Sequence, residues 1–549
     1  MTKTAPPDNG NFASLVFAQA SAHPEKLALV MPKTWDETGL HESEELTYGQ
    51  LIQRTRAMMA GLRHEGFQPG DRMVIAFPLS TDSYAFLWAL FALGVTAVLI
   101  DPGMGPQKVK EALDTANAKG IVGTGASLKL LYRALAPPLR RIPKKYTRDT
   151  GWFVKHFSTL VQEPDQAPEV VPRSPSDECM ITFTSGSTGR PKGANRTHGL
   201  LRAQHEALKA EYPPQNGQVD MPCFPNVATH NLCCGITTVL PAVDFAKPAE
   251  VAPRPVVQQM EQYGVSSMTG APAYMGRIAS YMMENGIQNS QVKRTGVGGA
   301  PVSAELCQQL LAVFPGVEGY VIYGSTEAEP MTNARLEEAC ETRQEGYLVG
   351  SPIPAIDLAL LNLPAEPPTL DHTSVGPYRV AAGETGEIVV RGAHVNPGYI
   401  ENEAANRENK LYEPDGSVWH RTGDLGFFDS AGRLWLVGRL KDVVRYQGRL
   451  VQPYPIEAIL EGVDGIERAA VITSENTPDG IVVLQSTETA SDKQVVAKAH
   501  EVLAAQDLAE MPTCTIAIVP VDGRHNSKID RPRLRKQVEQ NFQPGATRI

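Results

Sequence analysis

The stretch from Thr184 to Gly193 constrains this chain more than any other part of its sequence. Its ten residues, TSGSTGRPKG, hold three glycines, four hydroxyl side chains and two cations, and the short apolar run Met180–Phe183 precedes them. Glycines allow backbone turns with positive φ that direct several N–H groups at one point. Hydroxyls and cations supply further donors around that point. This composition after a strand favours a loop that binds a phosphate chain; the alternative is a Ser/Gly-rich surface loop.

The run differs from the phosphate loop of the common NTPases. That motif requires glycine before the lysine and a hydroxyl residue after it, whereas Lys192 lies between Pro191 and Gly193. The run resembles instead the nucleotide-phosphate loop of the adenylate-forming superfamily, which includes acyl-CoA synthetases, luciferases and nonribosomal adenylation domains. The resemblance implies that the following residues contact the phosphates of ATP: Thr184, Ser185, Gly186, Ser187, Thr188, Gly189 and Lys192.

Two further motifs resemble the adenine-binding segments of that superfamily. Gly298-Gly299-Ala300-Pro301 matches the wall of the adenine pocket, which implies that Gly299, Ala300 and Pro301 contact the base. In Tyr323-Gly324-Ser325-Thr326-Glu327 the resemblance implies that Tyr323 and Gly324 contact the adenine, that Thr326 meets the phosphate and that Glu327 holds Mg²⁺. A hard cation prefers oxygen ligands, so a glutamate suits that place. Taken alone, this second motif is also compatible with a turn that carries a charged end.

The segment His420–Leu425, HRTGDL, resembles the motif whose aspartate accepts both ribose hydroxyls. A carboxylate is a natural bidentate acceptor for a vicinal diol. Arg439 follows Asp424 by fifteen residues, at the place of a second ribose or phosphate contact, and Lys441 matches the hinge about which the superfamily's small domain rotates. As isolated residues, Asp424 and Arg439 are equally compatible with a surface ion pair.

Near the end of the chain, Arg524–Arg531 resembles the motif that delivers the catalytic lysine. Lys528 takes that place, so the resemblance implies that it neutralises charge passing between the substrate carboxylate and the α-phosphate, beside Lys192 and Glu327. Such a cation contributes about 10²–10³ in rate in other charge-stabilising sites. Ser527 replaces the usual glycine and the proline-lysine-threonine opening is missing, which affects the expected loop geometry more than the charge.

With 549 residues the chain exceeds one hydrophobic core, so two or more domains are expected. Helical and strand patterns alternate in the first half, as in Gly49–His64 followed by Met73–Phe77. This alternation predicts parallel sheets covered by helices, an α/β fold. We expect a large N-terminal domain over residues 1–438 that binds ATP and the acyl group. A small mobile α+β lid domain over 439–549 would follow, with its hinge near Lys441.

An uncharged run of 17 residues, Tyr84–Ile100, raises the possibility of a membrane span, although it is short for a bilayer. Gly94 and the β-branched residues after it favour a helix over 82–93 and a buried strand over 95–100. The N-terminus lacks the apolar core of a signal peptide. Seven cysteines without a CxxC pair favour a reducing compartment, so we expect a cytoplasmic protein.

The net charge of −10 argues against a nucleic-acid partner. Residues 129–155 nevertheless carry eight Lys and Arg residues among apolar neighbours. Such a segment fits either a peripheral contact with an anionic membrane or an insertion that faces water.

The segment Met221–Pro241 matches the family region that lines the acyl pocket, which implies substrate contacts from Val227, His230 and Leu232. It contains no Asp or Glu, whereas relatives that activate amino acids usually place an aspartate there. Its small and apolar residues suit a carboxylic acid with an apolar chain. His230 matches the gate of the pocket, but it also fits a hydrogen-bonded core histidine.

The resemblance implies a ligase that uses ATP and Mg²⁺ to form acyl-AMP and pyrophosphate. The loop Tyr446–Pro453 is similar to the lid loop of acyl-CoA synthetases, which favours transfer to CoA. Three patches, 99–103, 325–330 and 521–528, resemble instead the olefin-pathway β-lactone synthetases, in which the substrate's own 3-hydroxyl displaces AMP. Transfer to a carrier protein, and an ATP-binding protein that has lost catalysis, are the remaining alternatives.

Overall fold

The structure is a computed structural model that describes most of the chain. The described residues are 9–100, 104–125, 128, 136–149, 154–184, 190–340, 345–362, 374–487, 489–521, 528–542 and 548. Most of the phosphate loop, residues 185–189, and the segment before Lys528, residues 522–527, lie outside them.

The first sheet of the N-terminal domain has the strand order β7-β6-β5-β3-β4-β8-β9. Its strands are β3 (Arg72–Ala76), β4 (Thr96–Ile100), β5 (Gly120–Gly123), β6 (Lys144–Thr147), β7 (Lys155–His156), β8 (Glu178–Thr184) and β9 (Lys192–Thr197). Helices α2 (Tyr48–His64), α3 (Thr81–Leu93), α4 (Pro106–Ala116) and α6 (Ala136–Arg141) lie between them in sequence. All pairs are parallel except β8 with β9. Strand β8 therefore carries the chain to the predicted phosphate loop, and β9 carries it back.

Helix α3 and strand β4 confirm the interpretation of the long apolar run. Ser80 caps the helix by accepting a hydrogen bond from Ser83 N–H, and Gly94 ends it with a φ of 72°. Trp88 and Phe91 are fully or almost fully buried, because the helix packs within the core on all sides. Across the described residues, the structure contains no helix with the length and apolarity needed to cross a membrane.

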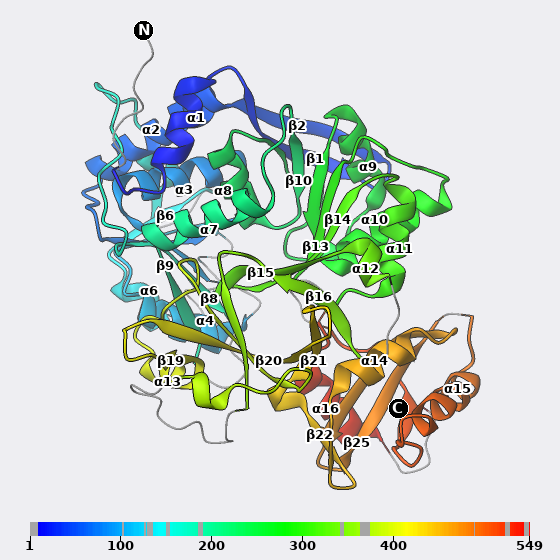
Figure 1. Ribbon diagram of the computed structural model, residues 1–549. Helices are drawn as coiled ribbons and strands as arrows, with labels where there is room; N and C mark the ends of the chain where they lie inside the picture. Colours follow the sequence, from blue (N-terminus) through cyan, green and yellow to red (C-terminus); the bar gives the residue numbers. More distant parts are fainter. Residues whose placement is uncertain are drawn as a thin grey trace.

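The second sheet has the order β17-β18-β20-β21-β16-β15-β14-β13-β12-β10-β11-β1-β2, with β19 paired to β20 (Figure 1). Its strands are β1 (Leu27–Asp36), β2 (Gly39–Thr47), β10 (Val219–Pro222), β11 (Thr237–Val239), β12 (Ser267–Gly270), β13 (Arg294–Gly298), β14 (Glu318–Ser325), β15 (Ala328–Arg335), β16 (Tyr347–Pro352), β17 (Asp357–Leu361), β18 (Gly386–Arg391), β19 (Lys410–Tyr412), β20 (Val418–Phe428) and β21 (Leu434–Arg439). The accompanying helices are α1 (Ser14–Ala22), α7 (His198–Glu211), α8 (Pro225–Cys234), α9 (Pro253–Gln262), α10 (Pro272–Glu284), α11 (Ala304–Val313), α12 (Leu336–Ala339) and α13 (Glu403–Asn409).

The second sheet is parallel only in part, whereas the alternation of helices and strands in the first half of the chain predicted parallel sheets. Strands β12, β13 and β14 are parallel and are connected through helices α10 and α11. From β14 onward the paired strands are antiparallel. A parallel neighbour needs a crossover of a dozen or more residues, whereas a short turn returns the chain antiparallel, as between β14 and β15.

The strands β13 and β14 approach closely at the GGAP motif. Gly298 pairs with Ile322, and a Cβ at Gly298 would collide with the carbonyl oxygen of Ile322. The glycine is therefore required by backbone packing, which keeps the carboxyl ends of the two strands side by side.

The substitution Gly298→Ala should destabilise the protein by about 1–3 kcal/mol, because the added methyl group overpacks this contact. The matched control is Gly276→Ala in α10, where the nearest heavy atom would lie 3.7 Å from the new Cβ. That change should be neutral or stabilise by about 0.5–1 kcal/mol. Thermal melting compares the two variants, and equal melting temperatures would contradict the packing argument.

Residues after 440 build hydrophobic cores of their own around Val471, Val482 and Leu534. Their elements are β22 (Val444–Tyr446), β23 (Arg449–Val451), α14 (Pro453–Glu461), β24 (Ile466–Ser474), β25 (Thr477–Ser486), α15 (Asp492–Ala504), β26 (Thr513–Thr515) and α16 (Arg531–Asn541). The overall class is thus the expected one, a large α/β domain followed by a smaller domain. Figure 1 shows the smaller domain, orange to red, beside β16 and β21.

Helix α14 connects the two domains. Tyr347 in β16 donates a hydrogen bond to Glu461 Oε2 at 2.9 Å. One turn earlier on the same helix, Glu457 is buried and accepts from the Arg531 guanidinium at 2.7 and 2.8 Å. Burial, and then the charge of Glu457, raise the pKa of Glu461 from 4.5 to about 7.

This raised pKa predicts a pH-dependent stability. The native state retains a proton on Glu461 that the unfolded state has already lost, so this carboxyl makes the protein less stable as pH rises from about 4.5 to about 7. Glu461→Gln should remove that part of the dependence, because the amide stays neutral. Thermal melts from pH 5 to pH 8 measure it.

Glu467→Gln, which changes an exposed carboxylate on the neighbouring strand β24, is the matched control and should melt with the pH profile of the wild type. If Glu461→Gln also kept the wild-type profile, Glu461 would not be the titrating group.

Candidate active site

Tyr323, Asp424 and Arg439 come together although they are far apart in sequence. Asp424 and Arg439 are opposite each other in the antiparallel pair β20 and β21, and Arg439 Nε lies 2.9 Å from Asp424 Oδ1. The other carboxylate oxygen, Oδ2, accepts from the Tyr323 hydroxyl at 2.8 Å. The charge of Asp424 raises the pKa of Arg439, and burial followed by the same charge raises that of Tyr323. Asp424 is thus part of a three-residue network and not a simple surface pair.

The GGAP motif lies next to this network. It follows the carboxyl end of β13, and Tyr323 belongs to the carboxyl-terminal part of the neighbouring parallel strand β14. Gly299 adopts a φ of 84° and faces the ring of Phe224. The crevice at the carboxyl ends of parallel strands is the usual ligand site of open α/β sheets.

Glu327, four residues beyond Tyr323, is held at both its backbone and its side chain. Its carbonyl oxygen accepts from Asn396 N–H at 2.7 Å, and its carboxylate accepts from the Tyr399 hydroxyl at 2.8 Å. Both partners belong to the short segment between β18 and α13. Arg196 supports the preceding residue, because it donates to the Thr326 carbonyl oxygen at 2.8 Å.

The surroundings of Glu327 favour its ionised form. Burial by itself would raise its pKa, but the imidazole of His420, the Tyr399 hydroxyl and the Lys410 ammonium lower it below the ordinary value. A carboxylate that stays ionised and keeps one oxygen for another partner fits a hard divalent cation such as Mg²⁺.

Lys192 lies beside this carboxylate site. Its ammonium donates to Asn409 Oδ1 at 3.2 Å, lies 3.5 Å from Glu408 Oε2 and is 5.7 Å from the centre of the Tyr399 ring. It is the first residue of β9, so the return strand of the phosphate loop sets its position. Ser185, Gly186, Ser187, Thr188 and Gly189, and the side chain of Thr184, lie outside the described residues.

Sequence motifs missed three residues of this cluster: Tyr399, Lys410 and His420. Lys410 is 3% exposed, and burial lowers its pKa to about 7. Burial also lowers the pKa of His420 to about 3, with the charge of Lys410 as the next cause. His420 belongs to the HRTGDL segment, whereas Lys410 begins a short strand of ordinary composition that gave no signal.

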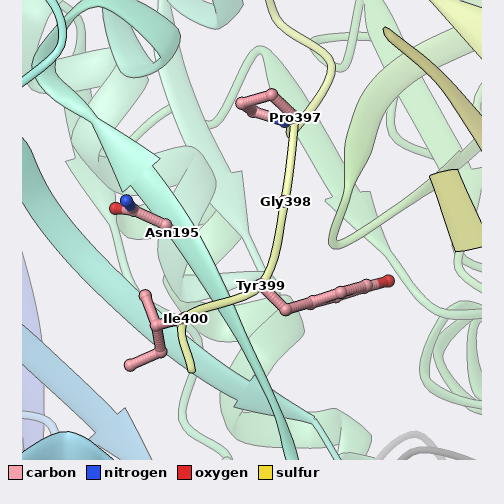
Figure 2. A pocket seen from close by; sticks show the side chains of 5 residues that line it. All are labelled: Asn195, Pro397, Gly398, Tyr399 and Ile400. Carbon is pink, nitrogen blue, oxygen red and sulfur yellow. The ribbon is translucent and has the colours of Figure 1, made fainter. Parts of the chain in front are cut away.

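A small hollow opens beside the cluster. It has a volume of about 230 Å³ and is lined by Asn195, Pro397, Gly398, Tyr399 and Ile400. Figure 2 shows the segment 397–400 running along β9, with the Tyr399 ring directed away from Asn195. The ring thus separates the hollow from the side on which its hydroxyl contacts Glu327.

The predicted acyl segment forms helix α8, where Val227 and His230 are half-buried and Leu232 is completely buried in the core beside α3. His230 Nδ1 lies 3.1 Å from His205 Nδ1, and its Nε2 lies 3.5 Å from Cys234 Sγ. Burial lowers the pKa of His230 to about 3, so the ring is neutral. Side-chain atoms of His205, His230 and Cys234 lie within 4.8 Å of one another, but their mutual hydrogen bonds already satisfy the groups.

The predicted hinge and lid residues lie on the other domain. Lys441 is exposed within a short 3₁₀ turn, Leu440–Asp442, directly after Arg439. Its neighbour Asp442 is buried and accepts from Arg535 at 2.9 Å. Lys528 is exposed and precedes Ile529, which forms an isolated bridge with Val521.

Several described basic residues of the segment 129–155 have partners within the protein. Arg148 pairs with Asp82 at 2.8 Å, Lys155 with Glu65 at 2.7 Å and Arg141 with Asp114 at 3.2 Å. These contacts give the cations a role in the fold, and a membrane contact through this segment stays a prediction.

One protein-family model and several curated proteins match this chain. The family model described as "AMP-binding enzyme" matches residues 16–400. An olefin β-lactone synthetase from Xanthomonas campestris pv. campestris is 31% identical, over 96% of this chain and 98% of the relative. A feruloyl-CoA synthase from Amycolatopsis sp. is 30% identical over 79% and 81%.

Solved structures share the fold. An o-succinylbenzoate coenzyme A synthetase from Bacillus subtilis, solved with ATP and a magnesium ion, matches 95% of this chain and 98% of its own with a TM-score of 0.75 and 18% identity.

Proposed function

The chain belongs to the AMP-binding enzyme family and is an adenylate-forming ligase, and on this premise we propose that it activates a carboxylic acid with an apolar chain as acyl-AMP. The observation that carries the proposal is the convergence of Tyr323, Asp424 and Arg439 with Glu327 and Lys192. These five residues come from four segments of the chain, with Tyr323 and Glu327 in the same one, and each has the chemistry that one part of Mg·ATP needs.

In this proposal Asp424 accepts the ribose hydroxyls and Arg439 keeps the carboxylate in place. Lys192 faces the phosphates, and Glu327 holds Mg²⁺, which neutralises phosphate charge when bound. The substrate carboxylate attacks the α-phosphorus, and pyrophosphate leaves. The small domain brings Lys528 to the reacting oxygens for this attack, and it then rotates about Lys441 for the second step.

For the second step we propose formation of a β-lactone from a 3-hydroxy acid. The 3-hydroxyl oxygen attacks the carbonyl carbon of acyl-AMP, the bond to AMP breaks, and the hydroxyl proton is released. Similarity to an olefin β-lactone synthetase over nearly the whole of both chains supports this step, together with the patches at 325–330 and 521–528.

Transfer to CoA is the second candidate. The loop that resembles the CoA-ligase lid loop is the hairpin of β22 and β23, in which Gln447 and Gly448 have φ values of 47° and 83°. Two consecutive positive φ values make a tight hairpin turn. This exposed tip is the feature that favours an incoming thiol.

Pyrophosphate release tests the proposal, with a panel of C8–C18 fatty acids and 3-hydroxy acids, each with and without CoA. We expect turnover with 3-hydroxy acids that is independent of CoA. Turnover that requires CoA and accepts plain fatty acids would replace the lactone step by thioester formation. Absence of release with every acid would refute the activation step itself.

The variant Asp424→Ala should raise the ATP concentration for half-maximal pyrophosphate release about 100-fold or more. It removes the acceptor of two charge-assisted hydrogen bonds, which contribute about 1.5–3 kcal/mol each. Initial rates over a range of ATP concentrations measure the change.

Asp429→Ala is the matched control. Asp429 lies just after the same strand and bonds Arg433 and Trp435, so its loss should lower stability and leave the ATP dependence unchanged. An equal change in both variants would assign the effect to the β20–β21 pair and not to ribose binding.

A further inference from the structure

Lys410 belongs to the site cluster but lies in none of the nucleotide-binding motifs. It begins β19 and lies directly opposite His420 in the β19–β20 pair, so both side chains project from the same face. Its ammonium donates to the Asn396 carbonyl oxygen and lies 3.2 Å from His420 Nδ1. It is also 5.2 Å from the centre of the Tyr399 ring.

A buried lysine is energetically costly, so its presence here calls for an explanation. Within the part of the chain that the structure describes, no carboxylate lies within ion-pair distance of its ammonium. Burying an ammonium without an ion partner costs several kcal/mol, and a methionine of similar length would fill the space without that cost.

The contacts of Lys410 lead to both ends of Glu327. One path passes through Asn396, whose carbonyl oxygen accepts from Lys410 and whose N–H donates to the Glu327 carbonyl oxygen at 2.7 Å. The other passes through Tyr399, whose ring faces the Lys410 ammonium and whose hydroxyl donates to the Glu327 carboxylate at 2.8 Å. The segment 396–399 thus holds Glu327 at two points, and Lys410 contacts this segment at Asn396 and Tyr399.

The segment has further support, because Asn406 accepts from Tyr399 N–H at 2.7 Å and donates to the Tyr399 carbonyl oxygen at 3.1 Å. Asn396 Nδ2 donates to the Asn195 carbonyl oxygen at 2.7 Å, and its Oδ1 accepts from Gly398 N–H at 2.8 Å. These bonds use the side chain of Asn396. Lys410 donates to the carbonyl oxygen of Asn396. Its ammonium also lies near the Tyr399 ring, which Lys192 approaches at 5.7 Å.

We propose that Lys410 is a positioning residue for Glu327. Through its contacts with Asn396 and Tyr399, Lys410 fixes the Glu327 carboxylate toward the divalent cation of Mg·ATP. Because Lys410 is 3% exposed, it acts through these two residues and does not touch the nucleotide. The inference rests on the proposed function, since that function supplies Mg·ATP as the ligand.

The test uses the full-length protein and a binding readout. Calorimetry measures ATP binding over a range of Mg²⁺ concentrations for the wild type, Lys410→Met and Lys410→Arg. Partners that orient a metal ligand typically contribute 10–100-fold to metal affinity. We expect Lys410→Met to raise the Mg²⁺ concentration for half-maximal ATP binding by about that factor, and Lys410→Arg to restore most of it.

Lys145→Met is the matched control. Lys145 is a half-buried lysine that also donates to a backbone carbonyl, that of Ile142, but it lies in β6 of the first sheet. Its loss should lower the melting temperature without changing the Mg²⁺ dependence. If Lys410→Met behaved in the same way, with a lower melting temperature and an unchanged Mg²⁺ dependence, Lys410 would be a structural residue and the proposal would be wrong.

Tyr399→Phe tests the path and covers the case in which Lys410→Met does not fold. It keeps the ring near the ammonium but removes the hydrogen bond to Glu327. It should therefore raise the Mg²⁺ concentration for half-maximal ATP binding, and its combination with a folded Lys410→Met should cost less than the product of the two single effects. Independent effects that multiply would contradict positioning through Tyr399.

The binding readout separates this inference from the proposed reaction. If the wild type binds Mg·ATP but releases no pyrophosphate with any acid, the reaction is wrong and the Mg²⁺ dependence of Lys410→Met still decides the role of Lys410. If the wild type binds no Mg·ATP, the proposed function fails and the role of Lys410 fails with it.

Discussion

The ion pair between Asp424 and Arg439 connects the parts of this molecule on which its site depends. It lies across the β20–β21 pair, and the second carboxylate oxygen of Asp424 accepts a hydrogen bond from Tyr323 in β14. Arg439 is also the last residue before the turn Leu440–Asp442, where the chain enters the smaller domain. One carboxylate therefore connects the β20–β21 pair, strand β14 and the residue that precedes the turn into the smaller domain. In the proposed function, ribose binding and the hinge of the small domain would both depend on it.

The sequence was sufficient for those parts of the fold that local patterns determine. Gly94 and the β-branched residues after it made α3 predictable, although the cap is Ser80 and not a later residue, and β8 before the phosphate loop followed from its apolar composition. The antiparallel half of the second sheet was not predictable in the same way, because partner choice among short strands is decided by packing at long range. The alternation of helices and strands in the first half therefore predicted more parallel pairing than the sheet contains.

The same distinction applies to the site. Tyr323, Glu327, Asp424 and Arg439 lie in motifs of distinctive composition, so residue type and spacing indicated them. Lys410 lies in the sequence Lys-Leu-Tyr, where Leu411 is buried in a core cluster and a lysine beside it would ordinarily face water. Its burial is caused by Asn396, Tyr399 and His420, which reach it only in the folded chain. Contacts of this kind cannot be read from a pattern of neighbours.

The two halves of the proposed site depend on different kinds of interaction. The nucleotide half is an arrangement of charges, in which Glu327, Asp424, Lys192 and Arg439 are each held by at least one hydrogen bond or ion pair of defined geometry. The proposed acyl half is a packed helix, α8, whose His230 bonds His205 of α7 and Cys234 of the same helix. Electrostatic positioning is sensitive to small displacements, whereas apolar packing tolerates substitution if volume is conserved. In the proposed function, we therefore expect changes in α8 to alter the choice of acid with less effect on ATP binding than changes around Glu327 or Asp424.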